Sequence, residues 1–302
     1  MKHSPLFLVL SMLLCGSTFG DDTLSAAAPS PVYTELKSDG KLIAEYRYAD
    51  APYKPYIVTL RTPSGKNILR DAPHDHKHHH ALMFALAVNG TNFWEEISNA
   101  GKEITNDIAV QPSSLKSGLV WQNAAGKVLL KEDRTISVTG SPEVTLLDWQ
   151  SVLKHPTDLP NDPPVDFDKS AHHYYGLGIR FDQSMDKQGV FFNSTGKNEG
   201  TLVRGDERLT PCHWTACTAK LHGESVTVAV FGNPKNPVPT LAFTMGDRVA
   251  HFKYIGISMN FHREPRQMQP KETMTFNFRV AVWDGEVSPE TVEKEYQKSI
   301  SP

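Results

Sequence analysis

The sequence has few cysteines, few long apolar runs and no excess of basic residues. Its 302 residues include three cysteines, of which only Cys212 and Cys217 lie beyond the first 20 positions. Two thiols are too few for a disulfide framework or a structural zinc site, and whether they bridge stays open. The formal net charge of −3 gives no basic surface for nucleic acid. No later apolar run is long enough to cross a bilayer, so we expect no membrane span.

The N-terminal residues are the one strongly apolar segment. Lys2 precedes the apolar block Leu6–Leu14, and small residues follow up to Gly20. This order is typical of a secretory signal peptide, so we expect an exported protein, periplasmic or secreted. The expected division is a signal peptide over residues 1–20, a disordered tether over 21–31 and a single domain over 32–302.

Strand-like alternation dominates the rest of the chain. The clearest case runs from Met274 to Val282, where apolar residues occupy every second position. Ten or more such segments, separated by turn residues, predict an all-β sandwich or barrel. The other expected strands are Leu42–Tyr48, Tyr56–Leu60, Ala81–Val88, Arg134–Thr139, Val144–Leu153, Leu177–Phe181, Val190–Asn193, Val226–Phe231, Leu241–Met245 and Tyr254–Phe261.

Only the C-terminus predicts a helix. Ser288 is a suitable N-cap, Pro289 suits the first helical position, and Val292, Tyr296 and Ile300 follow at four-residue spacing. We expect a short helix packed against the edge of a sheet.

A histidine-rich segment, His74–His80, is the densest chemical signal. Five of the 13 histidines lie in these seven residues. On an extended chain, His76, His78 and His80 would share one face, where they could bind Zn²⁺ or Cu²⁺. Acid/base or sugar contacts without a metal, and a purely structural polar loop, are the alternatives.

A second cluster, His172-His173-Tyr174, runs into the expected strand at Leu177–Phe181. It follows a Pro-rich acidic segment, His155–Asp168, that predicts a long loop. Histidines at the mouth of a sheet are accessible to a substrate, and a tyrosine ring can stack on a sugar. No nucleotide-binding glycine motif, serine-hydrolase elbow or HExxH zinc motif occurs in the chain.

Several motifs, in order along the chain, resemble the PmoA-like family of exported bacterial proteins. They are RTPSG at Arg61–Gly65, DHKHHHALMF at Asp75–Phe84, VNGTNFW at Val88–Trp94, GLGIRF at Gly176–Phe181, VAVFGNPKNP at Val228–Pro237 and FRVAVWDG at Phe278–Gly285. Arg and Gly are typical of the family where this chain has His80 and Ala81.

The resemblance implies a large antiparallel β-sandwich similar to the supersandwich of sugar mutarotases. Sites of that kind use two histidines and a carboxylate on one concave sheet. By that resemblance, His76 or His79 and His172 or His173 are the expected catalytic residues. The expected substrate contacts are Arg61, Asp75, His80, Trp94, Tyr174 and Arg180.

Three functions remain open from the sequence. The first is an exported enzyme that acts on a sugar or glycoside by histidine acid/base chemistry, through hydrolysis, elimination or epimerisation. The second is a non-catalytic carbohydrate-binding module. The third is a metal-dependent protein with a divalent ion on His76, His78 and His80.

Overall fold

The computed structural model describes Met1 and residues 33–167, 170–186, 189–197, 200–246 and 252–301. The expected signal peptide and tether therefore lie outside the described residues, apart from Met1, and export remains a prediction. The residues from Tyr33 onward belong to one compact unit. Among the described residues, no helix is long and apolar enough to cross a membrane.

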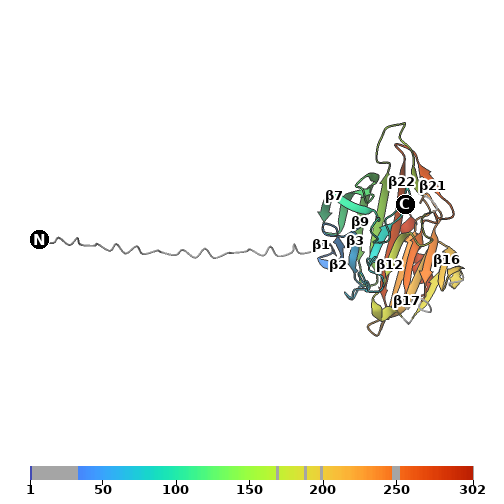
Figure 1. Cartoon of the computed structure of the whole chain (residues 1–302). Helices are drawn as coiled ribbons and strands as arrows, with labels where there is room; N and C mark the ends of the chain where they lie inside the picture. Colours follow the sequence, from blue (N-terminus) through green and yellow to red (C-terminus); the bar gives the residue numbers. More distant parts are fainter. Residues whose placement is uncertain (2–32, 168–169, 187–188, 198–199, 247–251, 302) are drawn as a thin grey trace. The chain divides into compact units, whose positions relative to one another are not determined.

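Two nine-stranded antiparallel sheets form the body of this unit. The first sheet has the order β1-β2-β3-β4-β12-β20-β19-β16-β15. In Figure 1 its early strands β1 to β3 and its late strand β16 lie at opposite ends of the unit. Its strands are β1 (Tyr33–Ser38), β2 (Lys41–Arg47), β3 (Tyr56–Leu60), β4 (Leu82–Ala85), β12 (Gly176–Arg180), β15 (Thr201–Arg204), β16 (Glu207–Pro211), β19 (Leu241–Met245) and β20 (Tyr254–Ser258).

The second sheet has the order β14-β13-β17-β18-β22-β10-β9-β8-β7. It contains the longest strands, which pair as a continuous antiparallel ladder at its centre. Its strands are β7 (Lys102–Gln111), β8 (Ser114–Gln122), β9 (Val128–Gly140), β10 (Thr145–Lys154), β13 (Val190–Asn193), β14 (Gly196–Lys197), β17 (Trp214–Leu221), β18 (Glu224–Gly232) and β22 (Thr273–Asp284).

The core lies between the two sheets. Ile179 and Ile255 from the first sheet share one hydrophobic cluster with Leu147, Val280 and Phe276 from the second. Buried residues alternate along β22 from Phe276 through Phe278 to Val280, as the period-2 pattern predicts for a half-buried strand. The expected all-β antiparallel sandwich is therefore confirmed.

Smaller elements complete the described fold. The C-terminal helix α1 (Pro289–Ile300) confirms the predicted one: the Ser288 side chain accepts a hydrogen bond from the backbone N–H of Thr291. Cys212 and Cys217 are buried free thiols rather than a disulfide. The remaining elements are β5 (Ala87–Val88) with β6 (Thr91–Asn92), β11 (Val165–Phe167) with β21 (Arg266–Met268), and a 3₁₀ turn, η1 (Gln183–Met185).

Candidate functional site

The outer face of the first sheet carries the side chains of the candidate site. Glu207 pairs with Met245, and Met245 pairs with Tyr254, across β16, β19 and β20. Directly paired residues of antiparallel strands point to the same face of the sheet. Phe243 lies two residues before Met245 and therefore shares that face, away from the core residue Ile255.

Gly178 on β12 lies beneath the aromatic side chains on this face of the sheet. A Cβ atom there would lie 1.8 Å from the Tyr254 hydroxyl and 2.9 Å from the Trp94 ring. Real atoms cannot approach so closely, so only glycine lets these two rings lie directly on the strand. Trp94 itself stacks on Tyr175, with ring centroids 5.4 Å apart and an interplanar angle of 13°.

The histidine-rich segment enters the site as a series of turns. The backbone N–H of His76 donates to Pro73 O at 2.9 Å, and that of His79 donates to His76 O at 2.9 Å. The extended conformation expected for this segment is therefore wrong. The turn stacks the rings of His76 and His79, with centroids 4.7 Å apart.

These turns do not assemble His76, His78 and His80 as a metal-binding trio. His80 Nδ1 lies 2.7 Å from Asp71 Oδ1, and its Nε2 lies 2.7 Å from Glu96 Oε1, so both ring nitrogens are committed to carboxylates. Within the described ranges, no three His, Cys, Asp or Glu side chains are placed to hold a metal ion. The donors present do not fit the Zn²⁺ or Cu²⁺ that the spacing suggested.

A cavity of about 410 Å³ opens above the sheet face, within the range of small-molecule sites. Both histidine clusters of the sequence reach it, the first through three histidines and the second through Tyr174. Its walls are mainly aromatic. The lining residues are His76, His78, His79, Trp94, Glu95, Tyr174, Arg204, Gly205, Asp206, Glu207, Phe243, Met245, Phe252 and Tyr254.

Several buried polar atoms of the lining lack hydrogen-bond partners among the described residues, and three of them belong to side chains that are at most 6% exposed. They are His79 Nδ1, Trp94 Nε1 and the Tyr254 hydroxyl oxygen. His79 is 6% exposed, Trp94 0% and Tyr254 2%. Because an unpartnered buried polar group costs about 1–3 kcal/mol, three together in one cavity indicate a place for a polar ligand.

Two of the cavity histidines, His78 and His79, are neutral at pH 7. Burial, reinforced by the neighbouring rings of His78 and His76, holds the pKa of His79 well below its usual range. Burial and the nearby Lys54 charge lower the pKa of His78 to about 4. Neutral imidazoles offer one donor and one acceptor nitrogen each, so they suit hydroxyl groups.

Glu207 is the best-positioned carboxylate. Burial alone would raise its pKa, but hydrogen bonds from His173 and Arg204 outweigh that effect and lower the Glu207 pKa. His173 Nε2 contacts Oε2, while Arg204 Nη2 and Nε donate to Oε1 at 2.7 and 3.0 Å. Glu207 is therefore ionised at neutral pH.

The second histidine cluster lies at one side of the cavity. The His172 ring stacks on the cavity residue Tyr174, with centroids 5.3 Å apart and an angle of 2°. His173 reaches the site through Glu207 rather than as a lining residue. The two sequence clusters are thus brought to one site, with His173 behind the carboxylate.

Three other expected substrate contacts do not line the cavity. Arg61 donates to Gly65 O at 3.1 Å within its own turn. The Arg180 guanidinium lies 3.5 Å from the ring centroid of Phe252, which covers it on the cavity side. Asp75 lies 3.2 Å from His76 Nδ1 and 3.7 Å from Arg180 Nη2, behind the lining histidine.

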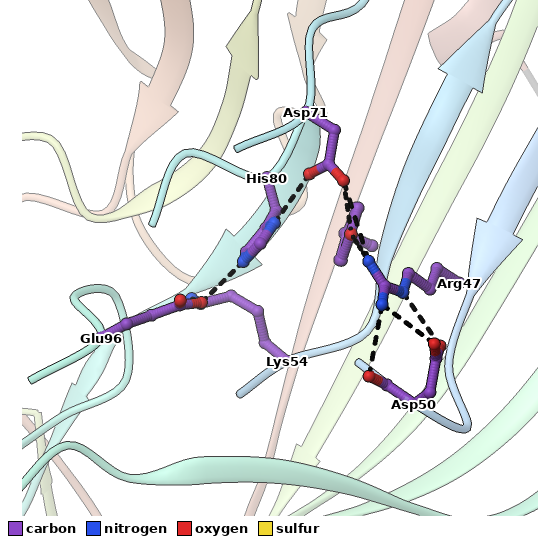
Figure 2. Close-up of polar contacts among 7 residues, drawn as sticks. Arg47, Asp50, Lys54, Asp71, His80 and Glu96 are labelled. Carbon is purple, nitrogen blue, oxygen red and sulfur yellow. Dashed lines mark hydrogen bonds and ion pairs between the residues drawn. The ribbon is translucent and has the colours of Figure 1, made fainter. Parts of the chain in front are cut away.

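His80, the remaining expected contact, belongs to a buried polar network (Figure 2). Its ring lies between Asp71 and Glu96, and Glu96 also accepts from Lys54 at 3.3 Å. Burial would lower the His80 pKa, but the hydrogen bonds to the two carboxylates outweigh burial and raise it. Tyr56 extends the network by donating to Asp71 at 2.8 Å.

This network joins the two loops that line the cavity. His80 follows His79 in the chain, and Glu96 follows Glu95. A charged hydrogen bond between His80 and Glu96 therefore holds the histidine turns against the Trp94–Glu95 loop. The network therefore positions the two loops, while His80 and Glu96 themselves do not line the cavity.

The sequence did not single out Arg204, Glu207, Phe243, Phe252 or Tyr254 as site residues. Only their positions in the paired strands and adjoining loops bring them together, and no short motif marks them. Pro73 and Asp75 did carry a signal for the histidine turns, because both residue types favour turns.

Comparison with models of known protein families identifies the family of this chain. Residues 33–297 match the model of a family of unknown function, DUF6807. The chain belongs to this family. The PmoA-like assignment made from the motif order is therefore wrong, since the matching model covers the same stretch of chain. A comparison with curated proteins finds no match.

Solved structures with a similar fold include sugar-related enzymes. A galactose mutarotase related enzyme from Lactobacillus acidophilus is 10% identical with a TM-score of 0.47, over 85% of this chain and 100% of that one. A putative aldose 1-epimerase from Escherichia coli is 10% identical with a TM-score of 0.45, over 83% and 99%. An α-galactosidase from Geobacillus stearothermophilus is 9% identical with a TM-score of 0.49, over 84% and 41%. Similarity at this level carries no argument about activity.

Proposed function

We propose that this protein binds a sugar or glycoside in the sheet-face cavity and acts on it by acid/base chemistry. The observation that carries the proposal is the set of three unpartnered buried polar atoms, on His79, Trp94 and Tyr254, inside aromatic walls. Sugars combine hydroxyl groups with apolar ring faces, so they match both features. The apolar leader adds export to the proposal, and N-terminal sequencing of the protein recovered from expressing cells tests that part.

Glu207 is the base in this proposal. An ionised carboxylate accepts a proton from a sugar hydroxyl or from an acidified C–H group. Arg204 and His173 hold its two oxygens in place and keep it ionised. Neutral His79 accepts or donates a hydrogen bond at a second hydroxyl, and the rings of Trp94 and Tyr174 form the apolar wall. A base and a hydrogen-bonding imidazole placed in this way could serve epimerisation, elimination or hydrolysis of a sugar.

Glu207→Gln tests the catalytic role. The variant and the wild type are incubated with a panel of mono- and disaccharides, and products are followed by NMR. A general base contributes about 10²- to 10⁴-fold in rate, so turnover should fall by that factor while the sugar still binds. Glu224→Gln, on a side chain 71% exposed and paired with Lys66, is the matched control and should keep full turnover. Undiminished turnover in Glu207→Gln would refute the role.

A non-catalytic carbohydrate-binding module is the second candidate. Its favouring observation is that both Glu207 oxygens already accept hydrogen bonds, which weakens a carboxylate as a base. This alternative predicts saccharide binding that weakens in His79→Leu, with no product from any sugar in the panel. Any turnover by the wild type excludes it.

A further inference from the structure

The lining of the cavity is acidic. It holds the carboxylates Glu95 and Glu207 and a single arginine, Arg204. Asp206 also lines the cavity and has an interaction of its own, so the negative excess of the lining does not depend on it. Arg204 binds Glu207 with two hydrogen bonds, so its charge is used within that pair. The lining histidines His78 and His79 are neutral and supply no compensating charge. The lining therefore carries a negative excess.

Glu95 is the carboxylate of the lining that lies next to an aromatic side chain, Tyr174. Its side chain accepts from the Tyr174 hydroxyl at 3.3 Å and from Asn92 Nδ2 at 3.2 Å. Both hydrogen-bond donors are neutral. Arg204 is near enough to interact with the Glu95 charge, but its hydrogen bonds go to Glu207. A half-buried carboxylate with neutral partners keeps its attraction for a cation.

The tyrosine that contacts this carboxylate belongs to a row of aromatic rings. Tyr174 contacts Trp94 at a centroid distance of 5.4 Å and Phe243 at 5.9 Å, and Phe243 contacts Tyr254 at 6.0 Å. The rings meet at angles between 48° and 65°, so they present differently oriented faces and edges along one wall. A carboxylate beside several aromatic rings suits an ammonium group, which the charge and the cation–π interaction both attract.

We propose that the cavity selects a sugar carrying a protonated amino group, with Glu95 and the Trp94–Tyr174 wall as the determinants of that selection. The inference rests on the proposed function, since it names the class of sugar for the same cavity. The amino group lies at Glu95, while hydroxyl groups take the free donors and acceptors of His79 and Tyr254. A sugar carboxylate or phosphate is repelled by the same acidic lining.

Three matched sugars test the selection by isothermal titration calorimetry at pH 7. Galactosamine, galactose and galacturonate differ in a single charged or neutral group, and tetramethylammonium serves as a cation without a sugar. Cation–π contact and a carboxylate with neutral hydrogen-bond partners together predict about tenfold tighter binding of galactosamine than of galactose. Galacturonate should bind more weakly than galactose.

Glu95→Gln should abolish the tenfold preference of galactosamine over galactose, because the amide keeps the shape and removes the charge. Glu35→Gln, an exposed charge on β1, is the control and should keep the preference.

Equal binding of galactosamine and galactose by the wild type overturns the charge selection and leaves the sugar function standing. Binding of tetramethylammonium but of no sugar overturns the sugar function and supports the charge selection. Binding of no probe contradicts both.

Discussion

His79 and His80 are neighbours in the chain but lie in opposite environments. His79 faces the cavity, is neutral, and has a ring nitrogen without a partner among the described residues. His80 faces the protein interior, where Asp71 and Glu96 hold both ring nitrogens and raise its pKa. Both side chains are buried, at 6% and 3% exposure.

The difference shows that hydrogen-bond satisfaction, rather than residue type, separates the ligand-facing histidine from the structural one. Burial without partners costs stability, so it indicates a group whose partner is a ligand. Burial with charged partners on both sides indicates a structural role. The His79 and His80 variants below test this distinction.

The largest expected effect is on stability, in the matched variants His80→Leu and His79→Leu. Loss of His80 leaves two carboxylates without their shared donor, and we expect the free energy of unfolding to fall by about 3 kcal/mol. Loss of His79 removes an unpartnered group and should change it by less than about 1 kcal/mol. Guanidinium unfolding followed by tryptophan fluorescence measures both.

For saccharide affinity we expect the reverse order, with a larger loss in His79→Leu than in His80→Leu. His79→Leu should lose most of its saccharide affinity while remaining folded. If the two variants were equally destabilised, the division between a satisfied and an unsatisfied histidine would be wrong.

A smaller effect is expected at the cavity floor. Gly178→Ala places a methyl group against the Tyr254 hydroxyl, and overpacking of this kind costs about 1–3 kcal/mol. Tyr254→Phe removes the oxygen that the methyl group meets, so the double variant should recover part of the loss. A double-mutant cycle in unfolding free energy measures the coupling. Strict additivity would show that the two groups do not meet.

The smallest effect is the pH dependence, where the two histidines have opposite signs. The raised pKa of His80 means that its contribution is complete below the unfolded value of 6.5 and is lost as pH rises through the folded pKa. The lowered pKa of His79 means that the folded state loses stability as pH falls below 6.5. Relative to wild type, His80→Leu should therefore be most destabilised at pH 6 rather than 8, and His79→Leu should gain as pH falls from 7 to 5. Unfolding curves at these pH values measure both trends, and trends of the same sign would contradict the assignment.

Much of the fold was predictable because one-sided burial leaves an alternating pattern. The pattern at Met274–Val282 and the cap at Ser288 correctly located β22 and α1. The strand β7 was missed because its ten residues lie at a sheet edge and are mostly exposed, which removes the apolar alternation.

The site was less predictable because it depends on pairing between distant strands. His76, His79, Trp94 and Tyr174 were found from local composition, and all four line the cavity. Glu207 was missed because β16 has no distinctive motif, and its place beside Met245 appears only once β16 and β19 are paired.

The most direct test of the account is a crystal structure of the protein soaked with galactosamine. The account predicts a sugar in the sheet-face cavity, with polar atoms within hydrogen-bond distance of His79 Nδ1, Trp94 Nε1 and the Tyr254 hydroxyl, and no contact with His80. A sugar bound elsewhere, or a cavity in which these three atoms remain without a ligand partner at saturating sugar, would contradict it.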